Sequence, residues 1–430
     1  MKRVYFHTLG CKVNQYDTES LAELFTKAGY GIADTPAGAN VIVVNSCTVT
    51  AEADRKTRQA VRRFRRIAPD SVIVLCGCVP QAYPAVAAAL PEADVVTGNK
   101  DHRLILDLVD RALSSRSCVV DIPSHAKGDD FEDFRLSAFS GRTRAIVKIQ
   151  DGCDRYCSYC IIPTSRGRSR SRSLESLSDE LDNFKAQGFR EVVLVGINFC
   201  CYGLDIGRTF VDAIELACGK GFDRVRIGSL EYDNISDEAI ARLAALPNFC
   251  PQFHISLQSG CDRTLKAMNR HYNSAEYLAL CEALRAAFPD AAITTDLMVG
   301  FPGETDEDFA DSLAFAEKAD FEKIHVFPYS ARPGTCAAEM EQVPASIKEA
   351  RTDAALKLSD ELRQKFFKSC LGKTVSVLCE TEKEGAAFGY TENYTPVKVL
   401  NCTGHSGKIV SVRVTGSEHD NLIGEFCSAG

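Results

Sequence analysis

The first hundred residues alternate short apolar runs with amphipathic segments. Residues 4–10 (VYFHTLG), 40–46 (NVIVVNS) and 71–77 (SVIVLCG) predict buried strands. Residues 17–29 predict the first intervening helix, with Asp17 or Thr18 as its N-cap and Gly29 near its end, and residues 51–66 predict the second. This βαβαβ order predicts a parallel sheet.

The alternation resumes after a polar linker at residues 124–134. Six runs predict strands, at residues 144–150, 191–198, 224–231, 252–260, 291–303 and 323–330. A long helical pattern at residues 346–370 precedes short alternating runs at 373–380, 387–400 and 408–416. We therefore expect an α/β protein with an N-terminal parallel βαβ domain (1–125), a central partial (β/α)6, TIM-like barrel (139–366) and a small all-β barrel or sandwich (367–430).

Composition indicates the cellular compartment of the protein and the role of its cysteine thiols. The chain has 430 residues, a net charge of −8 and 19 cysteines. Its N-terminus soon turns polar and no apolar run approaches the ~18 residues of a membrane span, so we expect a cytoplasmic protein with no membrane partner. Cytoplasmic thiols stay reduced, which makes metal or cluster ligation the leading use of the cysteines in motifs.

A cysteine directly follows each of the three N-terminal strands. These are Cys11, Cys47 and Cys78. Since the carboxyl ends of parallel strands share one edge, the three thiols can meet there and hold three irons of a four-iron cluster. Three buried thiols at strand ends would give the same pattern. Cys76 is a rival to Cys78, although it should point to the opposite side of the pleat.

Three more cysteines lie within eight residues, directly after the strand at 144–150. Cys153, Cys157 and Cys160 form C-x3-C-x2-C in the stretch CDRYCSYC. Three thiolates in one loop suit a four-iron cluster that keeps one iron open for a substrate or cofactor. A zinc site completed by a distant residue is the alternative.

This spacing is similar to that of radical S-adenosylmethionine (SAM) enzymes. Together with TLGCKVNQYDTE, VNSCTVTAEADRKTRQ, GCVPQ, DLMVGFPGETDEDF and the tail GYTENYTPVKV, it resembles the methylthiotransferases along essentially the whole chain. The resemblance implies an N-terminal domain with an auxiliary cluster, a radical SAM barrel and a C-terminal TRAM barrel that binds RNA. The first motif resembles the enzymes that act on N6-threonylcarbamoyladenosine in transfer RNA (tRNA).

The resemblance also implies the cofactors and the reaction. Cys11, Cys47 and Cys78 would hold an auxiliary 4Fe-4S cluster that carries or donates sulfur, and Cys153, Cys157 and Cys160 would hold the radical 4Fe-4S cluster. One SAM would supply a methyl group and another the radical that removes hydrogen from C2 of the adenine. The product would be the 2-methylthio derivative of the adenosine at position 37, 3′ of the anticodon.

Other substrates and functions stay open at this point. The same methylthiolation could act on isopentenyladenosine in tRNA or on an aspartate of a ribosomal protein. A radical tRNA methylase would need one cluster instead of two. A non-catalytic RNA-binding or iron-storing scaffold would bind tRNA without cleaving SAM.

Several residues near predicted strand ends are candidates for the cofactor or substrate pocket. They are Gly196, Asn198, Glu231, Ser256, Gln258 and Asp296, and Tyr159 matches the aromatic residue that the family places near the adenine of SAM. Strand-end capping and barrel packing are the alternative roles. The paired Cys200 and Cys201 depart from the small or β-branched residues that the family often has there, and only packing is expected of them.

Two basic segments are candidates for an RNA surface. Arg166, Arg168, Arg170 and Arg172 follow the cysteine loop, and Arg55 and Arg58, with Lys56, Arg62 and Arg63, lie on the predicted second helix. Their guanidinium groups suit the phosphates of an anticodon stem-loop. A solvated helix face and a disordered arm are the alternatives. The chemistry also implies a sulfur donor and an electron donor such as flavodoxin or ferredoxin.

Overall fold

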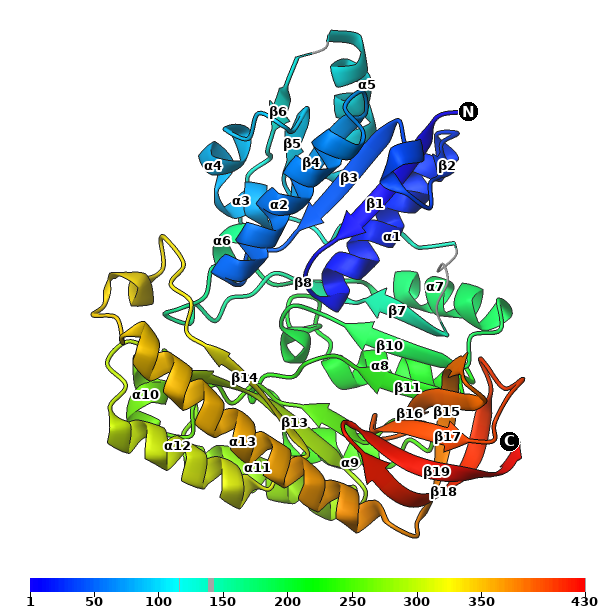
Figure 1. Cartoon of the computed structure of the whole chain (residues 1–430), viewed down its shortest axis with the longest axis vertical. Helices are drawn as coiled ribbons and strands as arrows, with labels where there is room; N and C mark the ends of the chain where they lie inside the picture. The colour runs from blue at the N-terminus through cyan, green and yellow to red at the C-terminus, as the bar shows by residue number, and fades with distance from the viewer. Residues whose placement is uncertain (116, 138–142, 430) are drawn as a thin grey trace.

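The computed structural model describes residues 1–115, 117–137 and 143–429, and it contains the three expected units. Figure 1 shows an N-terminal sheet with helices on both faces, a central barrel below it, and a small β-barrel at the C-terminus. The predicted fold class is confirmed. None of the described helices is long and apolar enough to cross a membrane.

The N-terminal unit is a six-stranded parallel sheet in the order β2-β1-β3-β4-β5-β6. Its strands are β1 (Arg3–Thr8), β2 (Gly31–Ile32), β3 (Val41–Ser46), β4 (Val72–Gly77), β5 (Val95–Thr97) and β6 (Val119–Asp121). Its helices are α1 (Lys12–Lys27), α2 (Ala51–Ile67), α3 (Cys78–Ala82), α4 (Pro84–Ala88), α5 (Ile105–Ser115) and the short η1 (Pro36–Gly38) and η2 (His102–Leu104). The three strands predicted to carry cysteines, β1, β3 and β4, are neighbours.

Strand β3 shows why the sheet is covered on both faces. Val41 and Val43 pack into one hydrophobic cluster with residues of α1 and α5, whereas Ile42 and Val44 pack into another with residues of α2. Successive side chains of a strand point to opposite faces, so a continuous apolar run requires helices on both. Cys76 belongs to the α1–α5 cluster, which agrees with its predicted side of the pleat.

The predicted start of the first helix is wrong. Helix α1 begins at Lys12, with Cys11 as its N-cap, and not at Asp17 or Thr18. Asp17 is instead a buried residue within α1 and pairs with Lys148. The Thr18 hydroxyl donates to the Asn14 carbonyl at 3.0 Å. The polar residues that resemble a cap are therefore used in packing. The helix ends as expected, just before Gly29.

The central unit has the six predicted strands. They are β7 (Arg144–Lys148), β10 (Glu191–Val195), β11 (Arg224–Ile227), β12 (Gln252–His254), β13 (Ala292–Val299) and β14 (Lys323–Pro328). They form two three-stranded parallel sheets, β7-β10-β11 and β12-β13-β14, which isolated parallel bridges such as Leu230–Ile255 join. The result is an open six-stranded barrel.

Helices cover the outside of this barrel. The long ones are α7 (Leu174–Ala186), α8 (Phe210–Gly219), α9 (Asp237–Ala244), α11 (Ser274–Ala287), α12 (Asp306–Ala319) and α13 (Ala345–Cys370). Short elements at the strand ends are β8 (Gln150–Asp151), α6 (Ile162–Arg166), β9 (Arg170–Ser171), η3 (Phe199–Cys201), α10 (Asp262–Ala267) and η4 (Cys336–Glu339).

The C-terminal unit is a closed five-stranded barrel. Its strands are β15 (Thr374–Lys383), β16 (Ala386–Thr391), β17 (Pro396–Leu400), β18 (Ile409–Glu418) and β19 (Asn421–Ala429), in the order β15-β16-β17-β19-β18. β19 was not among the predicted strands. The predicted boundary at residues 366 and 367 falls inside α13, which reaches both units, and the predicted start at residue 139 lies outside the described residues. The three domain ranges stay predictions.

Buried arginines at the start of the barrel strands hold the C-terminal unit in place. Arg226 is fully buried, pairs with Glu191 at 3.0 Å, and donates to the carbonyls of Thr391 and Glu392. Its guanidinium lies 4.6 Å from the ring centre of Tyr394. One side chain thus binds a buried carboxylate and two backbone carbonyls at and just after the end of β16 in another unit.

We expect Arg226→Met to destabilise the protein by about 3 kcal/mol, because it removes the closest of the three arginines that neutralise the buried Glu191 and leaves two backbone carbonyls without this donor. The chain has no tryptophan, so circular dichroism during urea unfolding is the measurement, with limited proteolysis to detect release of the C-terminal barrel. The control is Arg190→Met, which removes a half-exposed pair with Asp223 and should cost under about 1 kcal/mol. Equal effects of the two changes would contradict this role of Arg226.

Candidate active site

The three N-terminal cysteines meet at the carboxyl edge of the sheet, as predicted. The Sγ atoms of Cys11 and Cys78 lie 3.9 and 4.0 Å from the same atom, Asn14 Oδ1. Burial, followed by the neighbouring Cys78, raises the pKa of the Cys47 thiol to about 12. Cys47 and Cys78 are buried and Cys11 is exposed, so the trio lies in a pocket that is open on one side.

Two glycines allow this approach. Gly10 has φ +103°, and a Cβ there would lie 2.7 Å from the Cβ of Cys47. Gly77 has φ +93°, and a Cβ there would lie 2.5 Å from Asn45 Oδ1. Each glycine directly precedes a cysteine of the trio. Side chains at these positions would push the strand ends apart, because L residues rarely adopt this conformation.

Asn14 and Arg166 connect this trio to the barrel, and the motif analysis missed Asn14. Arg166 Nη2 donates to Asn14 Oδ1 at 2.5 Å and pairs with Asp17 at 3.0 Å, while Nη1 pairs with Asp151 at 3.1 Å. Lys148 joins the same group through Asp17 at 2.5 Å and Asp151 at 3.4 Å. We call Asp17, Lys148, Asp151 and Arg166 the ionic cluster. All four are buried.

The prediction that Arg166, Arg170 and Arg172 contact RNA is wrong. Arg166 belongs to the ionic cluster, Arg170 is buried beside Asp151, and Arg172 is fully buried in ion pairs with Glu180 and Asp133. Their guanidinium groups neutralise buried carboxylates and are not available to phosphates. Arg168 is different, because its side chain is 55% exposed and it pairs with Asp154 at 3.3 Å.

The second basic segment lies on the surface of α2. Arg55 is exposed and pairs with Glu52 one turn away, and Arg58 is partly exposed. Lys56, Arg62 and Arg63 are exposed on the same helix. The helix therefore presents a basic face, as expected, and the paired Glu52 reduces the charge at one end of it.

The C-x3-C-x2-C loop is held by the segment that follows α10. Ser158 donates its backbone amide to the Met268 carbonyl at 3.0 Å and its hydroxyl to the Ala267 carbonyl at 2.8 Å. Asn269 Nδ2 donates to the Tyr156 carbonyl at 3.1 Å. These bonds fix a loop that has no regular structure of its own.

Arg270 is a second residue that the motifs did not indicate. Its Nη1 lies 3.4 Å from Cys157 Sγ, and its Nη2 pairs with Glu231 and donates to the Ser256 carbonyl at 3.0 Å. Two candidate pocket residues, Glu231 and Ser256, lie in the segments that follow β11 and β12 and are thereby brought to the cysteine loop.

A cavity of about 330 Å³ lies beside Cys160. Tyr159, Gln258 and Asp296 line it, as do Val49 and Thr50 of the N-terminal domain. We call Cys11, Cys47 and Cys78 the first trio and Cys153, Cys157 and Cys160 the second trio. The cavity lies between the loop of the second trio and the segment that follows Cys47. Cys200 is buried with its Sγ 3.2 Å from the Glu231 carbonyl, and Cys201 is only half-buried.

Two buried oxygens at this site have no hydrogen-bond partner among the described residues. They are Gln258 Oε1 and Asn198 Oδ1. Asn198 Nδ2 lies 3.6 Å from Cys153 Sγ, so the free oxygen is next to the cysteine loop. Gly196 packs against Gln150. A Cβ at position 196 would lie 2.9 Å from Gln150 Oε1, so close packing explains the glycine there. The free oxygens suit a ligand with amino or hydroxyl donors.

The two cysteine trios fit iron–sulfur clusters better than single metal ions. Among the described residues no group of three His, Cys, Asp or Glu side chains converges on one ion. Cluster thiolates bind separate irons and need not converge. Burial raises the pKa of Cys153 to about 11 and that of Cys160 to about 12, so ligation must displace protons from these thiols.

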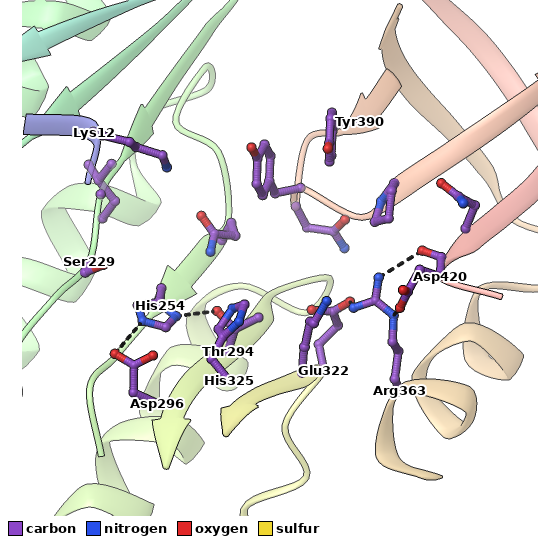
Figure 2. Close-up of a pocket in the computed structure, with 18 residues that line it drawn as sticks. Lys12, Ser229, His254, Thr294, Asp296, Glu322, His325, Arg363, Tyr390 and Asp420 are labelled. Carbon is purple, nitrogen blue, oxygen red and sulfur yellow. Dashed lines mark hydrogen bonds and ion pairs between the residues drawn. The ribbon is translucent and has the colours of Figure 1, made fainter. Parts of the chain in front are cut away.

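A larger cavity of about 600 Å³ lies between the barrel and the C-terminal unit. Figure 2 shows His254, Thr294, Asp296 and His325 along the barrel strands and Tyr390 opposite them. His254 lies 3.3 Å from Asp296 Oδ2. Burial opposes ionisation of the Asp296 carboxyl, but the contact with His254 keeps the pKa of Asp296 below its usual value. Asp296 lines both cavities, so it marks the place where they approach each other.

Lys12 reaches the larger cavity from the start of α1. Its ammonium lies 5.7 Å from the ring centre of Tyr394. Burial, together with the charges of Arg144 and Arg226, lowers the pKa of Lys12 to about 8. The residue after Cys11 is therefore a cation in a basic environment.

Comparison with known proteins agrees with this arrangement. Residues 147–316 match the Radical SAM superfamily, and residues 3–98 match the Uncharacterized protein family UPF0004. The threonylcarbamoyladenosine tRNA methylthiotransferase MtaB of Bacillus subtilis (strain 168) is 38% identical, over 99% of this chain and 96% of that protein. The tRNA-2-methylthio-N(6)-dimethylallyladenosine synthase of Symbiobacterium thermophilum is 34% identical, over 99% of this chain and 94% of that protein.

A solved structure shows the same fold at lower similarity. The radical S-adenosylmethionine methyltransferase TsrM of Kitasatospora setae superimposes with a TM-score of 0.57 at 16% identity, over 79% of this chain and 77% of that chain. The superfamily match lies on the barrel that carries Cys153, Cys157 and Cys160, and the relatives align from end to end. The chain therefore belongs to the radical S-adenosylmethionine methylthiotransferase family.

Proposed function

We propose that this enzyme converts N6-threonylcarbamoyladenosine at position 37 of tRNA to its 2-methylthio derivative. The observation that carries the proposal is that a single cavity is lined from both cysteine loops. One lies at the carboxyl edge of the N-terminal sheet and the other at that of the barrel, and the 330 Å³ cavity touches both loops. The name of the Bacillus subtilis relative supports the substrate.

Methylthiolation at C2 explains why two trios are needed. The C2–H bond of adenine has no useful acidity, so general bases cannot activate it. When bound at the second trio, SAM and a 4Fe-4S cluster would supply the radical chemistry and the methyl group. A second 4Fe-4S cluster at Cys11, Cys47 and Cys78 would carry the sulfur.

The protein's own residues would bind and orient these groups. Cys153, Cys157 and Cys160 would hold the radical cluster, with Arg270 and Asn198 donating to its sulfur ligands. Tyr159, Gln258 and Asp296 line the cavity beside Cys160, where the free oxygen of Gln258 would accept from SAM. Glu231 and Ser256 act through Arg270, and Gly196 through its packing on Gln150.

The RNA surface that we propose is smaller than the basic motifs suggested. It contains Arg168 beside the cysteine loop and Arg55 and Arg58 on α2, and it excludes the three buried arginines. An anticodon stem-loop bound there would need its target base turned out of the loop to reach the cavities. A cytoplasmic location, a sulfur donor and an electron donor such as flavodoxin or ferredoxin complete the proposal.

Iron content tests the two clusters. After anaerobic reconstitution we expect about eight irons per wild-type chain and about four in either triple variant, Cys11/Cys47/Cys78→Ala or Cys153/Cys157/Cys160→Ala. The control, Cys76→Ala, should keep about eight because Cys76 lies in the hydrophobic core. About four irons in the wild type would instead support a single-cluster tRNA methylase.

Nucleoside mass spectrometry tests the substrate. In total tRNA from a strain that lacks this gene, 2-methylthio-threonylcarbamoyladenosine should disappear and its precursor should accumulate. Complementation with the wild type should restore the product, and complementation with Cys153/Cys157/Cys160→Ala should not. Loss of methylthio-isopentenyladenosine instead, which the name of the Symbiobacterium relative suggests, would replace the proposed substrate. If no tRNA nucleoside changes, peptide mass spectrometry of the ribosomal protein from the same strains would show whether its aspartate loses the methylthio group.

Arg168→Glu should weaken binding of an anticodon stem-loop by roughly tenfold at low salt, with a smaller effect at high salt, because one phosphate contact is lost. Fluorescence anisotropy measures the affinity, and iron content should stay unchanged. The matched control is Arg111→Glu on α5, an exposed arginine on the far side of the N-terminal domain. Unchanged affinity of the Arg168 variant would remove this residue from the RNA surface.

A further inference from the structure

The 600 Å³ cavity between the barrel and the C-terminal unit has no role in the function proposed so far, yet it is built from charged side chains. Most of them neutralise each other. Arg363 pairs with Glu322 and Asp420 at 3.2 Å each, and His254 pairs with Asp296. These pairs are visible at the edges of the cavity in Figure 2.

Lys12 is not neutralised in this way. Within the described parts of the chain Lys12 forms no ion pair, and neither does Lys323, which also lines the cavity. The ammonium of Lys12 lies 5.7 Å from the ring centre of Tyr394. The carboxylate that acts on it electrostatically, Glu191, already pairs with Arg144, Arg224 and Arg226. A partly buried ammonium among arginines favours an anionic ligand.

The position of Lys12 in the chain says which part of a substrate would meet it. Lys12 directly follows Cys11, so the two Cα atoms are about 3.8 Å apart. C2 and N6 of adenine both lie on the Watson–Crick edge, with only N1 and C6 between them. A base that presents C2 to the cysteine trios therefore brings its N6 substituent to the neighbourhood of Lys12.

We propose that Lys12 binds the carboxylate of the threonylcarbamoyl group and that the 600 Å³ cavity is the pocket for this N6 substituent. The proposal rests on the proposed function, because it assumes a target adenine between the two trios. Ser229 lines the same cavity, and its exposed hydroxyl offers a polar partner for the carbamoyl or hydroxyl group.

This assignment makes Lys12 a residue that determines substrate specificity. An isopentenyl group has no charge and no hydrogen-bonding atom, so it would fill the cavity and leave the ammonium without a partner. A site that is built for a polar group strongly disfavours an analogue that lacks it. The same charge would also disfavour an esterified or amidated threonine.

The test is binding of anticodon stem-loops whose threonyl group carries either a free carboxylate or a neutral methyl amide. Wild-type protein should bind the carboxylate form roughly tenfold or more tightly, since one charged contact distinguishes the two RNAs. Lys12→Gln should reduce this preference to about one, and Lys12→Arg should retain most of it. The control is Lys27→Gln, an exposed lysine at the other end of the same helix.

The ratio of the two affinities is measured within each variant, so a change in folding or cluster content affects both RNAs equally. If Lys12→Gln keeps the preference for the carboxylate, the inference is overturned while the proposed function stands. If it weakens both RNAs by the same factor, Lys12 contacts a phosphate of the RNA and the inference is also wrong. If the wild type shows no preference for either RNA over an unmodified stem-loop, the proposed substrate itself fails.

Discussion

The buried ionic cluster of Asp17, Lys148, Asp151 and Arg166 is the interaction on which the site depends. Each of the four residues is at most 3% exposed. Arg170 also lies 3.5 Å from Asp151, so three buried cations surround the two carboxylates. Removal of one member from such a group is strongly destabilising, because the others stay buried without compensation.

This cluster explains how two separate units form one site. Asp17 comes from α1 of the N-terminal sheet, and Lys148 and Asp151 come from the first strand of the barrel and the segment after it. Arg166 lies six residues after Cys160 and reaches Asn14, whose amide oxygen lies near Cys11 and Cys78. One guanidinium thereby links the loop of the second trio to the first. The spacing between the trios follows from this contact and not from either unit alone.

The two cavities differ in the polarity of the side chains that line them. The smaller one is largely apolar around Tyr159, Met298 and Phe327 and lies beside Cys160, whereas the larger one contains most of the charged groups. Asp296 lines both, and its contact with His254 keeps it ionised at the junction. In the functions proposed above, the smaller cavity would take SAM and the larger one the charged substituent on the adenine. The C-terminal barrel completes the larger cavity, so its docking through Arg226 and Tyr394 also shapes the substrate pocket.

The sequence by itself determined the three-unit architecture, most of the strands along the chain and both cysteine trios, whereas β19 was missed. These features depend on local periodicity and on residues at strand ends, which parallel strands must bring to one edge. Tertiary structure decided which arginines are buried in ion pairs and which are exposed. Arg166 and Arg168 look alike in the sequence, but one is buried beside Asp17, 149 residues away, and the other is exposed. It also decided that Asp17 is an ion-pair partner and not a helix cap, and that Asn14 and Arg270 lie at the cysteines. A side chain's charge and spacing do not show which distant carboxylate needs neutralising, and only the folded chain supplies that partner.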